Sequence, residues 1–173
     1  STDTTFGEDP DGVGVGGWLE GEGTAGPNGA EKRAAGSGND SASPDGDRFA
    51  AIFSTNGSGN NGWICRTVDA TSYNSLMLSY HWRGDLDANN GSDEAVAEYK
   101  LGGACVDGND GTGWTNLATH ELSGTGGSWT TLSPFALPGD TAGASFLLRF
   151  RTRNAENAEF FRVDGVVVTG TPN

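Results

Sequence analysis

The sequence is short of cationic residues. Its 173 residues include only two lysines, Lys32 and Lys100, eight arginines and no glutamine, and the formal net charge is −13. Nucleic-acid binding needs clustered lysine and arginine to neutralise phosphates, so we expect no nucleic-acid partner. The acidic balance instead fits surroundings in which cations, calcium among them, screen the carboxylates.

Long apolar runs and helical periodicity are also missing. No window approaches the roughly 18 consecutive apolar residues of a membrane span, which predicts no membrane insertion. No segment carries the 3.6-residue apolar stripe of a surface helix. The length is that of one domain, residues 1–173, and the 29 glycines suit many turns rather than an unfolded chain.

Alternation with a period of two residues is what the sequence does contain. In the run Leu76–Arg83, Leu76, Leu78 and Tyr80 share one face with Trp82. Similar runs predict about nine strands: Val13–Leu19, Arg48–Ser54, Gly62–Val68, Leu76–Arg83, Glu94–Leu101, Trp114–Thr119, Ser128–Leu132, Phe146–Arg153 and Phe160–Thr169. Short strands joined by Gly/Asn/Asp turns predict an all-β, antiparallel β-sandwich of the jelly-roll type.

Two N-terminal segments stand outside this pattern. The stretch Gly21–Asp47 is polar and rich in glycine, which predicts a long surface loop or flap. Residues 1–6 resemble an isolated strand. This strand either pairs at an edge of its own sheet or is donated to a neighbouring subunit.

The two cysteines, Cys65 and Cys105, are relevant to whether the protein is secreted or intracellular. In a secreted protein one disulfide is the default interpretation, and two separate buried thiols are the alternative. Because the chain begins with Ser1 rather than Met, we expect a processed form that is secreted or held at the cell surface.

The second half of the chain, about Gly62–Thr169, resembles MAM-like or carbohydrate-binding-module-like jelly-roll domains of secreted bacterial proteins. The segments that carry the resemblance are Arg66–Asp69 with Leu76–Arg83, Trp114–Leu117 with Trp129–Leu132, and Leu148–Thr152 with Phe161–Val168. Such modules bind sugars, mediate adhesion, accompany proteases or form assemblies. The N-terminal third departs from the pattern, and Cys105 lies in an insertion, 102–113.

Clusters of oxygen-bearing side chains predict calcium sites. Calcium takes six to eight oxygen ligands from carboxylates, amides and carbonyls. The first cluster contains Asp85, Asp87, Asn89, Asp93 and Glu94, and the second contains Asp107, Asn109 and Asp110. A third site, Glu8 and Asp47 with Asp164, follows from the resemblance, because related jelly rolls join an early acid to an aspartate near the last strand. The alternative is that these clusters only form turns.

Arginine and tryptophan are the candidate ligand-binding residues. Arg149, Arg151 and Arg153 share one strand face, where they either grip acidic groups of a ligand or pair with Glu94 and Glu98 on a neighbouring strand. The rings of Trp63 and Trp114 follow glycine-rich turns and are candidates for stacking on sugar rings; burial in the core is the alternative.

Catalytic motifs are absent from the sequence. Its two histidines, His81 and His120, lack metal-ligand spacing, and neither Gly-x-Ser-x-Gly nor His-Glu-x-x-His occurs. We therefore expect a non-enzyme. Two functions remain: a calcium-stabilised subunit that assembles with copies of itself into a filament or surface array, or a carbohydrate-binding or adhesion module that contacts polysaccharide.

Overall fold

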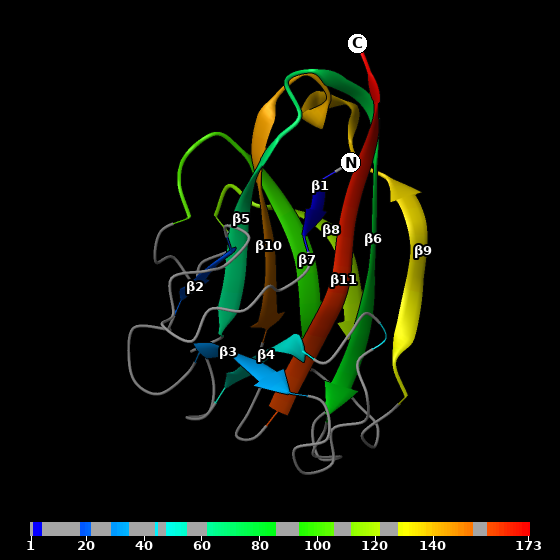
Figure 1. Cartoon of the computed structure of the whole chain (residues 1–173). Helices are drawn as coiled ribbons and strands as arrows, with labels where there is room; N and C mark the ends of the chain where they lie inside the picture. The colour runs from blue at the N-terminus through cyan, green and yellow to red at the C-terminus, as the bar shows by residue number, and fades with distance from the viewer. Residues whose placement is uncertain are drawn as a thin grey trace.

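The structure, a computed structural model, consists of two antiparallel sheets that face each other (Figure 1). It describes residues 2–4, 18–21, 29–34, 44, 48–54, 62–85, 94–105, 112–121, 128–153 and 159–173. The predicted all-β sandwich is confirmed.

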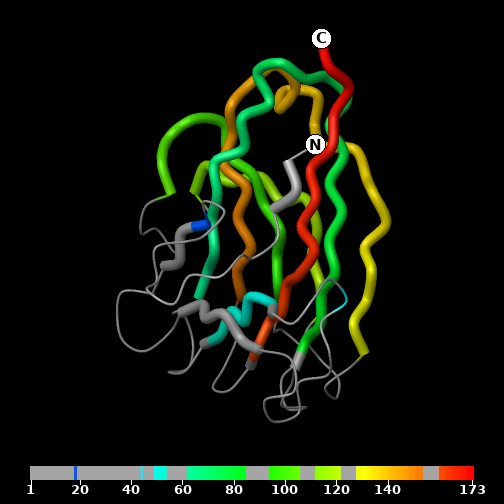
Figure 2. Tube along the Cα trace, in the orientation of Figure 1, coloured from blue at the N-terminus to red at the C-terminus, as the bar shows by residue number. Residues whose placement is uncertain are grey.

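Sheet A has the strand order β3-β4-β11-β6-β9, with β1 paired to β11. Its strands are β1 (Thr2–Thr4), β3 (Gly29–Ala34), β4 (Arg48–Ser54), β6 (Tyr73–Asp85), β9 (Thr130–Ala136) and β11 (Glu159–Pro172). The two long strands β6 and β11 run side by side along the length of the molecule (Figure 2).

Sheet B has the strand order β2-β5-β10-β7-β8. Its strands are β2 (Trp18–Gly21), β5 (Trp63–Asp69), β7 (Glu94–Leu101), β8 (Thr115–Glu121) and β10 (Ser145–Arg153). A 3₁₀ turn, η2 (Gly139–Thr141), precedes β10. Because β10 is the central strand of sheet B, its side chains are flanked on both sides by other strands.

The core lies between the sheets, where the period-two alternation places the apolar side chains. Leu76, Leu78 and Tyr80 of β6 pack in one buried cluster with Phe146 and Phe150 of β10. Burying one such side chain contributes about 1.5–3 kcal/mol, so the alternation that predicted the strands also stabilises the sandwich.

A bulge in β11 changes which side chains face the core. The pairing of β11 with β6 shifts by one residue between Asp164 and Val167, and Gly165 there has φ +55°. Glycine adopts this left-handed conformation without steric cost. The shift lets Val163 before the bulge and Val166 after it both pack in the core.

The described residues form eleven strands instead of about nine, because β1 and β3 add to the nine that the alternation predicts. Strand β3 lies inside Gly21–Asp47, the segment predicted to be a loop. The sequence of β3, Gly-Ala-Glu-Lys-Arg-Ala, lacks the alternation of a half-buried strand and therefore does not indicate a strand. As an edge strand paired only with β4, it tolerates charged residues. Within the predicted strand Val13–Leu19, strand structure begins at Trp18, and residues 13–17 lie outside the described residues.

The N-terminal strand pairs within its own chain. Thr2–Thr4 run antiparallel to β11, opposite Val166–Val168. The edge-strand alternative is therefore confirmed for these three residues.

Candidate functional site

The outer face of sheet B carries the three arginines of β10. Antiparallel pairing places Arg149 opposite Glu98 and Arg153 opposite Glu94 on β7. Glu98 accepts a hydrogen bond from Nη2 of Arg149 at 3.1 Å and another from Nε of Arg151. Glu94 likewise accepts from Nε of Arg153 at 2.7 Å. The alternative of cross-strand pairing is thus confirmed.

This pairing overturns the prediction that Arg149 and Arg151 present free charges to a ligand. Their relative exposures are 1% and 5%, and Glu98 is equally buried at 4%. Removing charges from water costs several kcal/mol per ion unless partners compensate, so the carboxylate and the arginines depend on one another. Arg153 is more exposed, with 37% of its side-chain surface accessible.

Trp114 lies directly over this charged group. Cζ of Arg149 is 3.9 Å from the centroid of the Trp114 ring, and Nζ of Lys100 is 6.0 Å from it. A guanidinium over an indole face is a favourable cation–π contact, worth about 0.5–2 kcal/mol depending on desolvation. The ring remains partly exposed. Glu98 therefore fixes Arg149, and Arg149 in turn supports an indole that reaches the surface.

A disulfide holds the same region together. Cys65 of β5 is bonded to Cys105, which follows β7, as the sequence predicted. Cys65 is buried with Trp63 and Leu147, and Cys105 and Trp114 pack against them. The bond therefore anchors the segment after β7 to the middle of sheet B, close to Trp114.

Trp63 does not have the exposure predicted for it. Its relative exposure is 3%, because it lies opposite Arg151 in the sheet and packs beside the disulfide. The prediction that Trp63 offers a ring face to a ligand is wrong. Burial in a cluster on the outer face of a sheet, rather than in the main core, could not be anticipated from local sequence.

The accessible part of this surface follows β7 and β8. We name the group of Lys100, Trp114, Asn116 and Thr119 the β8 face. Asn116 and Thr119 are exposed, and Nδ2 of Asn116 donates a hydrogen bond to Oγ1 of Thr119 at 2.7 Å. The β8 face thus offers an indole beside an ammonium, with an amide and a hydroxyl farther along β8, and so combines an apolar platform with hydrogen-bonding groups.

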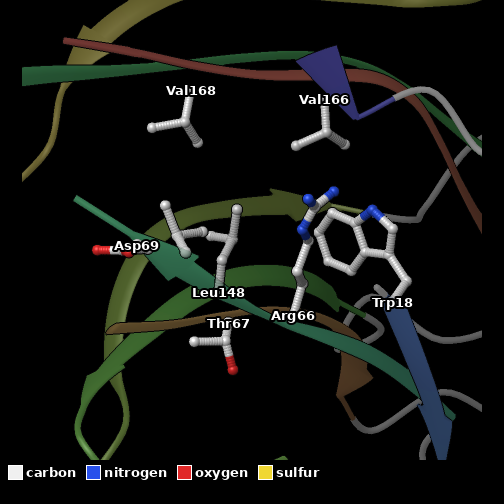
Figure 3. Close-up of a pocket in the computed structure, with 8 residues that line it drawn as sticks. Trp18, Arg66, Thr67, Asp69, Leu148, Val166 and Val168 are labelled. Carbon is white, nitrogen blue, oxygen red and sulfur yellow. The ribbon is translucent and has the colours of Figure 1, made fainter. Parts of the chain in front are cut away.

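A cavity of about 170 Å³ opens between the two sheets (Figure 3). Trp18 and Arg66 of sheet B line it together with Val166 and Val168 of sheet A. Arg66 is not among the site residues predicted from the sequence. The alternation could have indicated it, because Arg66 shares a strand face with Ile64, which is buried in the core, and Val68, which packs against the core.

A buried histidine lies inside the sandwich. Nε2 of His120 and the hydroxyl of Tyr80 are 2.6 Å apart, and the imidazole stacks on Trp82 with a centroid distance of 4.2 Å. Burial lowers the pKa of His120 to about 4 and raises the pKa of Tyr80 above its ordinary value. Both groups are therefore uncharged near neutral pH, where they act as packed, hydrogen-bonded core residues.

The predicted calcium ligands fall mostly outside the described residues: Glu8, Asp47, Asp87, Asn89, Asp93, Asp107, Asn109 and Asp110. Asp85 ends β6, Glu94 pairs with Arg153, and Asp164 is 2% exposed on β11, opposite His81. Within the described ranges, no group of three or more His, Cys, Asp or Glu side chains is placed to hold a metal ion. Calcium binding stays a prediction.

Among the described residues, no helix has the length and apolar character required to cross a membrane.

Comparisons with known proteins identify the fold but no family. No family model matches the chain, and no curated protein matches it. Among solved structures, the K2 cleaved adhesin domain of Lys-gingipain is similar with a TM-score of 0.65 and 14% identity, covering 96% of each chain. TmCBM61, solved in complex with β-1,4-galactotriose, has a TM-score of 0.59 and 8% identity, covering 88% of each chain.

An enzyme shares the same architecture. A cyclase from Fischerella sp. TAU, in complex with 4-(1H-indol-3-yl)butan-2-one, has a TM-score of 0.55 and 16% identity, covering 95% of this chain and 87% of the cyclase. At these identities the similarity shows a shared β-sandwich fold. It supports the carbohydrate-binding-module-like resemblance at the level of fold, but not the MAM-like one specifically. Function must be argued from the site.

Proposed function

We propose that this chain is an extracellular, non-catalytic module that binds polysaccharide, as a carbohydrate-binding or adhesion domain, through the β8 face. The observation that carries the proposal is the Trp114 indole, partly exposed and supported from within the sheet by Arg149. A rigid aromatic ring presents a large contact area with little loss of conformational entropy on binding.

The comparisons support this choice among the functions of the fold. Similar structures include an adhesin domain and a module bound to a galactose oligosaccharide. The Cys65–Cys105 disulfide supports an oxidising, extracellular location. Self-assembly into a filament lacks such support: the similar structures named above are an adhesin domain, a carbohydrate-binding module and a cyclase, and Thr2–Thr4 pair within their own sheet.

The charge of the chain favours a neutral ligand. A net charge of −13 repels polyanions over long distances, and Arg149 and Arg151 are already engaged by Glu98. Lys100, Asn116 and Thr119 supply donors and acceptors of the kind that neutral sugar hydroxyls require. We therefore expect neutral polysaccharides to bind better than uronic-acid polymers.

The proposal is tested by affinity gel electrophoresis against a panel of neutral and acidic polysaccharides. The wild-type chain should be retarded by at least one neutral polymer. Trp114→Ala should weaken the retardation at least tenfold, since truncating a central tryptophan of a binding surface costs about 2 kcal/mol or more. Trp129→Ala is the matched control, because Trp129 is also partly exposed but packs against Phe49 of sheet A.

The control variant should retain the mobility shift of the wild type. If no polysaccharide retards the wild-type chain, the proposed function is wrong. If Trp114→Ala binds as well as Trp129→Ala, the β8 face is not the site.

A further inference from the structure

We propose that the cavity between Arg66 and Val166 is a second ligand site, specific for a small carboxylate with an apolar body. This site is separate from the β8 face and does not depend on the proposed polysaccharide binding. It lies between the sheets, whereas the β8 face lies on the outside of sheet B.

Arg66 occupies a position that the fold reserves for apolar side chains. It lies opposite Trp18 of β2 and Leu148 of β10, both of which are buried in the main core. Figure 3 shows its guanidinium beside the Trp18 ring, directed toward Val166 on the opposite sheet. Arg66 as a whole is only partly buried, but its Nη1 atom is buried, and a buried charged donor needs a partner.

The guanidinium has an unused donor atom. Nη1 of Arg66 is buried and has no hydrogen-bond partner among the described residues. The nearest acid in sequence, Asp69, points away from Arg66 in Figure 3, and its carboxylate accepts hydrogen bonds from N and Oγ1 of Thr71. Leaving a buried donor unpaired costs about 1–3 kcal/mol, more for a charged group. Burial also lowers the pKa of Arg66, in keeping with a charge that the described residues around it do not compensate.

The other walls of the cavity are mainly apolar. Val68, Leu148, Val166 and Val168 line it together with the indole of Trp18, and Thr67 and Asp69 complete the lining on the β5 side. An engineered protein cavity of about 150 Å³ accommodates a benzene molecule. The volume here, about 170 Å³, therefore suits one ring or a short aliphatic chain.

Together these features define the ligand chemistry. A guanidinium binds a carboxylate through paired, charge-assisted hydrogen bonds. The valines, the leucine and the indole favour an apolar body over a sugar ring, whose hydroxyls would be left unpaired against them. Benzoate combines the two features and is the appropriate probe.

The test is titration of the ¹⁵N-labelled chain followed by NMR, with four probes. Benzoate should give saturable shifts at the amides of Trp18, Arg66 and Val166. Benzyl alcohol, which lacks the charge, acetate, which lacks the ring, and glucuronate, which has a polar body, should each bind at least tenfold more weakly.

Variants separate a binding role from a structural one. Arg66→Met keeps the length of the side chain and should weaken benzoate binding at least tenfold while raising the melting temperature of the free protein, because an uncompensated charge is removed. Arg66→Lys should retain part of the affinity. Arg153→Met, which removes an arginine on the outer face of sheet B, should bind benzoate within twofold of wild type.

Three results would overturn the proposal: no saturable shifts with benzoate, equal benzoate affinity in Arg66→Met and wild type, or tighter binding of glucuronate than of benzoate. The last would instead make the cavity a sugar site. Loss of polysaccharide binding in Trp114→Ala leaves all of these outcomes unchanged, so the two proposals fail independently.

Discussion

The guanidinium of Arg149 lies over the indole of Trp114, with Cζ 3.9 Å from the ring centroid. This contact joins the buried ion pairs of sheet B to the surface of the β8 face. Glu98 accepts a hydrogen bond from the same guanidinium at 3.1 Å, so the position of the exposed ring depends on a carboxylate beneath it.

Glu98→Gln should strongly destabilise the fold. The change removes the negative charge that pairs with the buried Arg149 and Arg151, and breaking a buried ion pair on one side costs about 3–5 kcal/mol. Urea unfolding at neutral pH measures the loss. Glu94→Gln is the matched control, because Glu94 also pairs with an arginine of β10 but keeps 33% of its side-chain surface exposed.

The free energy of unfolding of Glu94→Gln should fall by at most about 1 kcal/mol, because an exposed ion pair contributes no more than that to stability. Equal losses in the two variants would show that burial does not make the Glu98 pairs different from the Glu94 pair.

Burial of His120 should make stability fall with acid. The folded pKa is about 4 and the ordinary value is 6.5, so the unfolded chain takes up the proton first as the pH falls. The contribution of His120 to the free energy of unfolding is fully present above pH 6.5. It decreases by about 3 kcal/mol in total as the pH falls toward 4.

The other titrating groups of an acidic chain also respond to pH, so the comparison must be made against a variant. The difference in unfolding free energy between wild type and His120→Gln, measured by urea at pH 7 and pH 4, isolates the histidine. It should shrink by about 3 kcal/mol at the lower pH. A difference that does not change with pH would contradict a buried, neutral His120.

The disulfide should be a major source of stability. It joins residues 40 positions apart, and in the chain-entropy model closing a loop of that length stabilises the folded state by about 4 kcal/mol. The double variant Cys65→Ala/Cys105→Ala should therefore lose between about 2 and 5 kcal/mol in urea unfolding. A loss below about 1 kcal/mol would show that the bond is not a principal constraint on the fold.

The sequence predicted the sandwich well because most strands have one face in the core. Leu76, Leu78 and Tyr80 show the alternation that both defines β6 and fills the space between the sheets. Strand β3 escaped prediction because an edge strand with charged residues has no such alternation. The bulge at Gly165 escaped it because one inserted residue changes which side chains face the core without altering the composition.

The site was predicted less well, for a reason that concerns pairing between strands. The sequence indicated Trp114 and the acidic partners of the β10 arginines, and all of them meet on one face of sheet B. Whether a given ring on that face is covered depends on residues far away in sequence. Trp63 is buried beside a disulfide whose two cysteines are 40 positions apart in the sequence. No local pattern around Trp63 indicates this contact.

Calcium remains a prediction from the sequence, based on the oxygen-rich segment with Asp87, Asn89 and Asp93. Calcium at millimolar concentration should raise the melting temperature, and EDTA should reverse the gain. The variant Asp87→Asn/Asp93→Asn should respond less than wild type. Identical melting curves with calcium and with EDTA would mean that these residues form turns only. Size measurement under the same two conditions tests assembly as well.

The most direct test of the central claim is to map a bound oligosaccharide on the protein. Once a retained polysaccharide is identified, a soluble oligomer of it is titrated into the ¹⁵N-labelled chain. The account predicts saturable shifts centred on the amides of Lys100, Trp114, Asn116 and Thr119 and on the indole Nε1–H of Trp114. Saturable shifts confined to sheet A or to the cavity around Arg66, with Trp114 unchanged, would contradict it.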